Sequence, residues 1–198
     1  MAVVVTAIHT GVKMSRVSKS AVLALATAVC AVIVAVPAQA KTEQIKSGQT
    51  TVKLSPLVQA LLAKTGLTVT PVGPAKVGGG SLSMPMSSGP MSVPSMNGKM
   101  KSKGGLRFRF GTRTLVIRDY MISHHGKNAA VSAIVHGKRI TLARITHMKA
   151  KMSGKHGKMS GTLRITAAWA NLINKLFGAN IAHAGQDLGE LTMAVKMA

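Results

Sequence analysis

Residues 163–196 read LRITAAWANLINKLFGANIAHAGQDLGELTMAVK, and the spacing of their apolar side chains changes twice. Leu163 and Ile165 alternate with polar residues, which is typical of a half-buried strand. Thr166 is a favourable helix N-cap, and Gly178 is a favourable helix end. Between them, apolar residues recur with the three-and-four spacing of one helical face: Trp169, Leu172, Ile173, Leu176 and Phe177. The stretch predicts a strand, a helix, a turn and a second strand, with the chain's only tryptophan in the hydrophobic core.

A second unit of the same kind is predicted earlier in the chain. Residues 52–54 read as a short strand, and Ser55 followed by Pro56 marks the start of a helix. The apolar face of this helix is formed by Leu57, Val58, Leu61 and Leu62. Gly66 ends the helix, and alternating apolar residues then predict a strand over residues 67–72. The two units share the order of their elements and little sequence identity.

The segment of residues 73–103 is rich in Gly, Pro, Ser and Met. This composition is compatible with a low-complexity linker, and it is also compatible with several short strands. Met84 and Met86 alternate with serine or proline, and the dipeptide 97–98 is an Asn-Gly hairpin signal. We therefore predict strands over most of the segment, with a loop at residues 78–80.

Residues 106–145 have the clearest β-strand pattern of the chain. Apolar residues alternate with arginines over residues 106–110, and two further runs at 131–135 and 140–145 are joined by a His-Gly-Lys turn. Residues 149–158 read KAKMSGKHGK, which we interpret as a basic loop. Several short strands are expected, with turn signals about every 8–12 residues. This pattern predicts a mainly β fold, an antiparallel sandwich or barrel with two short helices packed on it.

Residues 1–40 have the three parts of a secretory signal peptide. A basic segment with Arg16 and Lys19 precedes an apolar run at residues 21–36, and a small-x-small cleavage site ends at Ala40. The apolar run is shorter than the roughly 20 residues of a membrane-spanning helix. We therefore expect cleavage near Ala40, no transmembrane segment afterwards, and a secreted or cell-wall-associated protein.

The predicted organisation after cleavage is simple. We expect residues 41–51 to form a polar tether and residues 52–198 to form a single β-rich domain. Met14 stands at the usual distance before the basic segment, so translation from Met14 is an alternative start. The only cysteine, Cys30, lies in the predicted signal, which excludes disulfides and thiolate metal sites from the mature chain.

The mature chain is strongly basic, because cleavage after Ala40 removes three of the 26 Lys and Arg and none of the four Asp and Glu, which leaves a formal charge of +19. For an exported protein this excess indicates an anionic envelope polymer or an anionic lipid surface as partner. Specific nucleic-acid binding is disfavoured, because aromatic residues make up only 3% of the chain. The predicted anion-binding residues are Lys127, Lys138, Arg139, Lys149, Lys151, Lys155 and Lys158. A basic surface that only keeps the protein dispersed is the alternative.

Several segments together carry a resemblance to a known family. They are VKLSPLVQALLAKTGLTVTPVGPAKV (52–77), SMPMSSGPM (83–91), NGKMKSKGGL (97–106), ITAAWANLINKLFG (165–178) and AGQDLGELTMAV (184–195). Their order resembles that of the HtaA-like domains of secreted actinobacterial proteins, which are linked to haem acquisition. The resemblance implies an exported binding domain, and it implies haem held by a tyrosine and by a histidine in a turn before a glycine-leucine strand. The corresponding turn here, residues 101–105, reads KSKGG and has no histidine.

Four residues are candidates for binding haem or a metal: Tyr120, His124, His125 and His156. Tyrosine and histidine both serve as axial haem ligands, and a basic surface suits the haem propionates. The structural alternative makes Tyr120 a half-buried strand residue and residues 124–127 an exposed hairpin turn. Haem binding is therefore an alternative function, and our primary interpretation has no cofactor.

Methionine and histidine also permit a copper site. The mature chain has eleven methionines, with clusters over residues 84–100 and 148–159 near His147 and His156. Soft thioether sulfur binds copper(I). The alternating spacing, together with the family resemblance, favours packing of these methionines in a core.

The sequence contains no catalytic pattern. The mature chain has only four acidic residues, and one of them, Glu43, lies in the predicted tether, so a carboxylate pair for glycoside hydrolysis is disfavoured. The nucleophile-elbow, zinc-protease, phosphate-loop and dinucleotide motifs are all missing. We therefore predict no catalytic residues and a non-enzymatic binding domain that acts at the cell envelope.

Overall fold

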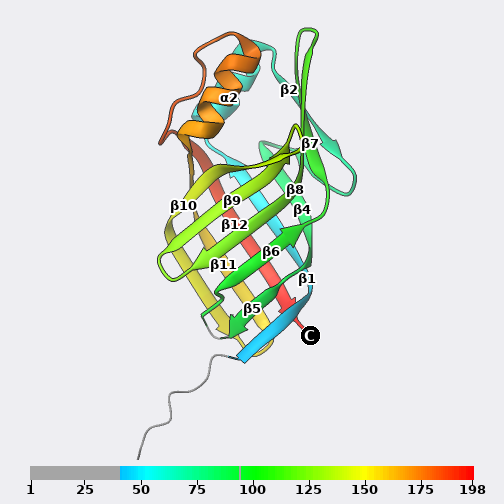
Figure 1. Cartoon of the computed structure of the whole chain (residues 1–198), viewed down its shortest axis with the longest axis vertical. Helices are drawn as coiled ribbons and strands as arrows, with labels where there is room; N and C mark the ends of the chain where they lie inside the picture. Colours follow the sequence, from blue (N-terminus) through cyan, green and yellow to red (C-terminus); the bar gives the residue numbers. More distant parts are fainter. Residues whose placement is uncertain (1–40, 94) are drawn as a thin grey trace, which may run out of the picture. The chain divides into compact units, whose positions relative to one another are not determined.

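The computed structural model describes residues 41–93 and 95–198 (Figure 1). The predicted signal peptide and its cleavage site lie outside these residues. The helices are α1 (Pro56–Thr65) and α2 (Ala167–Phe177). The strands are β1 (Lys41–Leu54), β2 (Thr68–Val72), β3 (Lys76–Gly78), β4 (Ser81–Ser88), β5 (Pro90–Val93), β6 (Gly98–Ser102), β7 (Gly105–Phe110), β8 (Arg113–His125), β9 (Asn128–Val135), β10 (Lys138–Ser153), β11 (His156–Ile165) and β12 (Asp187–Met197). No helix in the described ranges combines the length and apolarity needed to cross a membrane.

Eight of the strands close into an antiparallel barrel. Around the barrel the order is β8, β9, β10, β11, β12, β1, β4 and β6, and the pairing of β6 with β8 closes the ring. Figure 1 shows α2 above one end of the barrel and the C-terminus at the other end. Residues 73–103 supply β3 to β6, as their alternation predicts. The predicted mainly β fold with two short helices is confirmed, and of the two predicted architectures the chain forms the barrel.

Strand β8 carries a β-bulge that decides which of its side chains face the barrel interior. Asp119 has φ = 54°, and the pairing with β9 shifts register between Arg118 and Met121. Strand β7 pairs with β8 up to Arg118, whereas β6 pairs with β8 from Met121 onward. Because the bulge inserts one residue, the inward-facing row moves from odd to even residue numbers, and Tyr120 and His124 become buried.

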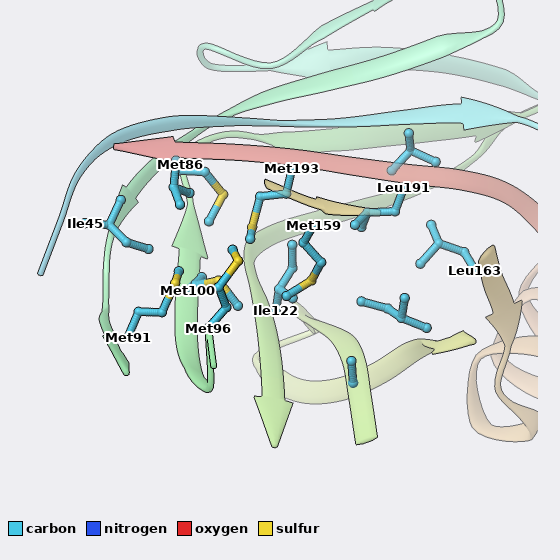
Figure 2. Close-up of a cluster of buried hydrophobic side chains, with 14 of the residues drawn as sticks. Ile45, Met86, Met91, Met96, Met100, Ile122, Met159, Leu163, Leu191 and Met193 are labelled. Carbon is cyan, nitrogen blue, oxygen red and sulfur yellow. The ribbon is translucent and has the colours of Figure 1, made fainter. Parts of the chain in front are cut away.

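The core is divided into two clusters. The cluster near the β10-β11 turn is rich in methionine, and Figure 2 shows several of these side chains directed into the barrel interior. Its buried methionines are Met86, Met91, Met96, Met100, Met159, Met193 and Met197. The cluster near the helices contains Tyr120 and Trp169, so the predicted burial of the tryptophan is confirmed.

Both helices begin and end where the sequence predicts. The Ser55 hydroxyl oxygen accepts a hydrogen bond from the Val58 amide (3.3 Å), and the Thr166 hydroxyl oxygen accepts one from the Trp169 amide (3.3 Å). Each helix ends at a glycine in the left-handed conformation. Side-chain capping and glycine termination are local effects, which is why they can be predicted from sequence.

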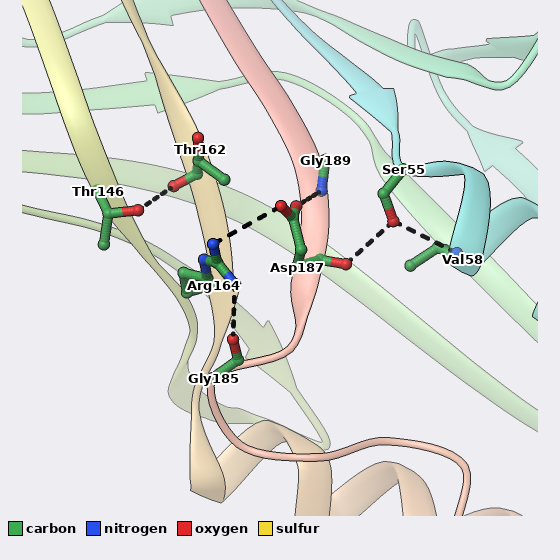
Figure 3. A network of polar contacts seen from close by, with 8 residues as sticks. All are labelled: Ser55, Val58, Thr146, Thr162, Arg164, Gly185, Asp187 and Gly189. Atoms are coloured by element: carbon green, nitrogen blue, oxygen red, sulfur yellow. Dashed lines mark hydrogen bonds and ion pairs between the residues drawn. The ribbon is translucent and has the colours of Figure 1, made fainter.

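A polar network joins the start of α1 to the strands beside it (Figure 3). The Ser55 hydroxyl donates to the Asp187 backbone carbonyl (3.0 Å), and the Asp187 Oδ1 atom accepts from the Gly189 amide (2.7 Å). Asp187 Oδ2 lies 3.9 Å from the Arg164 guanidinium, which also donates to the Gly185 carbonyl (3.3 Å). One aspartate therefore links α1, β11 and the start of β12.

Two predictions of local structure are wrong. Residues 41–51 form the first part of β1 instead of a tether, and β1 pairs with β12 on one side and with β5 and β4 on the other. The segment is polar because only some of its side chains, such as Ile45 and Thr50, face the interior. Residues 149–158 form the ends of β10 and β11 instead of a loop, with a turn at residues 154–155.

The bulge can be tested with a pair of substitutions at one position. Asp119→Val is expected to lower the free energy of unfolding by about 1–2 kcal/mol relative to Asp119→Gly, because a side chain branched at Cβ is strained in the left-handed conformation and glycine is not. Urea unfolding followed by tryptophan fluorescence measures the difference. A valine variant as stable as the glycine variant would contradict the positive φ at this position.

Candidate functional site

Four of the predicted anion-binding lysines lie on the β10-β11 hairpin, where strand pairing sets their spacing. Lys149 and Lys151 are exposed on β10, and Lys158 is exposed on β11 directly opposite Lys151. Lys155 lies in the turn between the two strands. Directly opposed residues have Cβ atoms about 4.5–5.5 Å apart, and like charges in such positions destabilise a sheet.

The positive charge continues onto β12, where Lys196 is the register partner of His156 on β11. We call the following side chains the cationic ladder: Lys149, Lys151, Lys155, His156, Lys158 and Lys196. None of the four acidic residues of the chain lies on the β10-β11 hairpin. The two ion pairs found within residues 41–93 and 95–198, Lys41–Glu43 and Arg164–Asp187, lie outside the ladder. The ladder is therefore a concentration of positive charge without neighbouring carboxylates on its hairpin.

The other predicted anion-binding residues are not part of the ladder. Lys127 lies in the turn between β8 and β9, at the same end of the barrel as the ladder. Lys138 and Arg139 begin β10 at the opposite end. The Arg139 guanidinium donates to the Asp119 carbonyl (3.1 Å) and to the Ser132 hydroxyl (3.3 Å), so it supports the bulge of β8. The structure thus divides the predicted set between two ends of the barrel.

The four predicted haem or metal ligands do not converge. Tyr120 faces the barrel interior, and His124 is buried four residues further along β8, roughly 13 Å away by the rise of a strand. His125 and His156 are exposed on different strands. The expectation of an exposed turn at residues 124–127 is wrong for His124, because the bulge turns this side chain inward.

Both ring nitrogens of His124 lie against backbone oxygens. Nδ1 is 2.8 Å from the Met96 carbonyl oxygen, and Nε2 is 2.8 Å from the Gly126 carbonyl oxygen. The Gly126 amide in turn donates to the Asn97 side-chain oxygen (2.9 Å). His124 therefore joins the turn before β6 to the turn after β8, and neither nitrogen is directed toward a ligand site.

This structural role predicts different effects for two adjacent histidines. His124→Leu is expected to lower the free energy of unfolding by about 1–3 kcal/mol, because the buried Met96 carbonyl group loses its polar partner. His125→Leu, at the exposed neighbour, should change it by less than about 0.5 kcal/mol. Urea denaturation compares the two variants, and equal effects would contradict the link between the turns.

The methionines considered as a copper site lie mainly inside the barrel, which confirms the prediction of packing. The Met86 sulfur accepts hydrogen bonds from the hydroxyls of Thr50 (2.8 Å) and Ser102 (3.3 Å). His147 and His156 are exposed on the outer surface, so imidazole and buried thioether groups do not meet. In the part of the chain that the structure describes, no group of three or more His, Cys, Asp or Glu could hold a metal ion.

An apolar cavity, which sequence reasoning missed, lies at the helix-covered end of the barrel. Its volume is about 170 Å³, and it is bordered by α1, α2 and the barrel strands. The side chains at the cavity include Val58, Leu61, Leu62, Phe108, Trp169 and Ile173, with Thr50, Ser102, Tyr120 and Gln186 as polar groups. Helix α1 buries none of its residues. The apolar face predicted for α1 was the only sequence signal, and it is equally typical of a fully packed helix.

Tyr120 differs from the other hydroxyl groups at this cavity. The hydroxyls of Thr50 and Ser102 donate to the Met86 sulfur, and the Gln186 Oε1 atom accepts a hydrogen bond from the His183 amide. Among the described residues no fully buried side-chain oxygen or nitrogen lacks a hydrogen-bond partner. Since no described residue bonds to the Tyr120 hydroxyl, this group keeps some accessible surface, and Tyr120 is one of the residues that line the cavity. Burial raises the pKa of the Tyr120 phenol, which keeps the group protonated as a hydrogen-bond donor.

These features define a helix-covered, eight-stranded antiparallel β-barrel domain, and the fold is that of the HtaA domains of Corynebacterium glutamicum. The crystal structure of the C-terminal domain of HtaA aligns with a TM-score of 0.66 and 13% identity, over 79% of this chain and 99% of that chain. The N-terminal domain of HtaA aligns with a TM-score of 0.62 and 15% identity, over 78% and 98%. The structure described as heme binding protein HtaB, from the same organism, aligns with a TM-score of 0.54 and 12% identity, over 80% and 96%.

No protein-family model and no curated protein sequence matches the chain. Because the structural neighbours share only 12–15% of their residues with it, the likeness shows the fold. The HtaA-like fold predicted from the order of sequence signals is confirmed.

Proposed function

We propose that this protein is a non-enzymatic domain that binds a flexible anionic polymer of the cell envelope through the cationic ladder. The observation that carries the proposal is the pairing of Lys151 with Lys158, two exposed lysines held opposite each other on a hairpin without a carboxylate. This arrangement weakens the sheet, because like charges that face each other across strands are destabilising. A bound polyanion offsets the repulsion.

The geometry of the ladder suits a chain of repeated phosphate or carboxylate groups. Residues two apart on a strand face the same side at a spacing of about 6.6 Å, and strand pairing adds a second row beside the first. Lys149 and Lys151 form one row, and His156 and Lys158 form the facing row. Their backbone is already ordered by the hairpin, so binding orders side chains without also ordering a loop.

A lipid surface suits the ladder less well. Proteins that lie on a membrane insert apolar side chains beside their basic residues. In the described ranges the large apolar side chain with high exposure is Leu57, at 61%, and it lies on α1 at the opposite end of the barrel. The ladder therefore offers charge without an adjacent apolar anchor, which favours a polymer.

Binding to long-chain inorganic polyphosphate, used as the probe, should depend on the ladder. Lys151→Gln combined with Lys158→Gln is expected to weaken binding several-fold at about 0.1 M salt, measured by isothermal titration calorimetry. Raising the salt to about 0.5 M should weaken binding by the parent protein more than tenfold, and should weaken the double variant less, because fewer charges remain to be screened.

Lys64→Gln combined with Lys138→Gln is the matched control, since it removes the same charge from the helix-covered end. If the control weakens binding as much as the ladder variant, net charge governs binding and the proposal is overturned. Binding to phosphatidylglycerol vesicles without binding to polyphosphate would also overturn it, in favour of a lipid surface.

Haem is the second candidate, favoured by the fold shared with a structure described as a heme binding protein. Iron in haem needs an axial ligand from the protein. Among the described residues the apolar cavity offers the Tyr120 hydroxyl and no histidine. Burial raises the pKa of Tyr120 and so opposes the deprotonated form that binds iron, and the residues present therefore fit haem poorly.

A haem titration of the purified protein at high salt separates the two candidates. We expect the Soret band to stay close to that of free haem, and Tyr120→Phe to leave the titration unchanged. High salt is needed because a strongly basic protein collects anionic porphyrin through its surface charge. A saturable one-to-one shift that Tyr120→Phe abolishes would establish haem binding and displace the polymer as the primary ligand.

A further inference from the structure

We infer that the cavity beneath α1 and α2 binds a small uncharged molecule that is mostly apolar and carries one hydrogen-bond acceptor. Tyr120 donates to that acceptor, and the surrounding aliphatic and aromatic side chains contact the rest of the molecule. This site is independent of the proposed polymer site, because the cationic ladder lies at the opposite end of the barrel.

The volume of the cavity sets the size of the ligand. At about 170 Å³ it is close to the engineered apolar cavities of about 150 Å³ that stay dry and bind benzene. One aromatic ring with a short substituent, or the end of an aliphatic chain, fills such a space. A porphyrin is far larger.

The side chains at the cavity select against charge. Among the described residues no Lys, Arg, His, Asp or Glu lines it, so a carboxylate or an amine would lose its hydration without gaining a counter-charge. Tyr120 is 6% exposed, and its hydroxyl has no hydrogen-bond partner among the described residues. A carbonyl or ether oxygen of the ligand accepts a hydrogen bond from that hydroxyl. The site therefore prefers a molecule with such an oxygen over a hydrocarbon of the same shape.

Helix α1 covers the cavity without being packed into the core. Val58, Leu61 and Leu62 border the cavity and are only half-buried, and no residue of α1 is fully buried. A helix whose apolar side borders open space can form new contacts with a bound molecule. These three side chains can therefore contact the ligand, whereas the side chain of Trp169 on α2 is already buried in the core.

Two probes of matched shape test the role of the hydroxyl. Acetophenone carries a carbonyl oxygen, and isopropylbenzene replaces that oxygen with a methyl group. We expect both to bind the purified protein saturably in isothermal titration calorimetry at high salt. Tyr120→Phe keeps the ring and removes the hydroxyl, and it should weaken acetophenone binding by about 2–10-fold, as one hydrogen bond does, while isopropylbenzene binding stays unchanged.

Substitutions around the cavity test the location. Ala182→Leu fills the interior, and Leu61→Glu places a carboxylate at the side of α1, so each should abolish binding of both probes. Leu57→Ser, on the same helix but outside the lining, should leave binding unchanged. If Ala182→Leu does not fold, Leu61→Glu still decides, because α1 has no buried residue to disturb.

Three results would overturn the inference. The first is failure of both probes to bind saturably, and the second is binding that survives the two cavity variants. The third is equal weakening of both probes by Tyr120→Phe, which would remove the hydroxyl from its role as anchor. Polyphosphate binding by the Leu61→Glu variant tests the ladder separately, so failure at one site is distinguishable from failure at the other.

Discussion

Strand β8 has two partners on one edge, and the rest of the domain depends on the residue where the partner changes. Up to Arg118 it pairs with β7, and from Met121 it pairs with β6, which closes the barrel. The left-handed Asp119 lies between the two registers. On one side of this bulge the sheet is a closed ring. On the other side β7 and β2 branch away from it, and the cavity with its helices occupies that end, with Tyr120 at the boundary.

The closed end combines opposite chemistries on the two faces of one hairpin. Lys151 and Lys158 oppose each other on the outside, while Met159 packs inside at 1% exposure. Repulsion between opposed like charges costs roughly 0.2–1 kcal/mol, whereas burying a methionine side chain contributes about 1.5–3 kcal/mol. The inner face therefore stabilises a strand pair that the outer face alone would weaken, and the lysines are displayed in fixed rows because the methionines hold the strands.

Features that depend on local sequence could be predicted, and features that depend on distant partners could not. The helices were found from Ser55, Thr166 and their terminal glycines, because capping involves residues within one turn. The polar composition of residues 41–51 predicts a tether, whereas their strand structure comes from pairing with β12, at the far end of the chain. For the candidate sites, the sequence shows which residues are lysines, but it does not show that Lys151 lies opposite Lys158. That pairing, the burial of His124 and the cavity all depend on strand register and packing.

The methionine interior gives the closed end of the barrel a sensitivity to oxidants that aliphatic side chains would lack. Oxidation converts an apolar thioether into a polar sulfoxide, which no longer suits a core. Met91, Met96 and Met100 have 0% exposure, so an oxidant reaches their sulfur atoms only when the strands around them separate. An oxidised side chain then hinders reclosure, since the sulfoxide oxygen would be buried without a partner. Each opening of the barrel in an oxidising environment thus allows these methionines to be oxidised. The rate of sulfoxide formation at the three positions therefore measures how often the barrel opens.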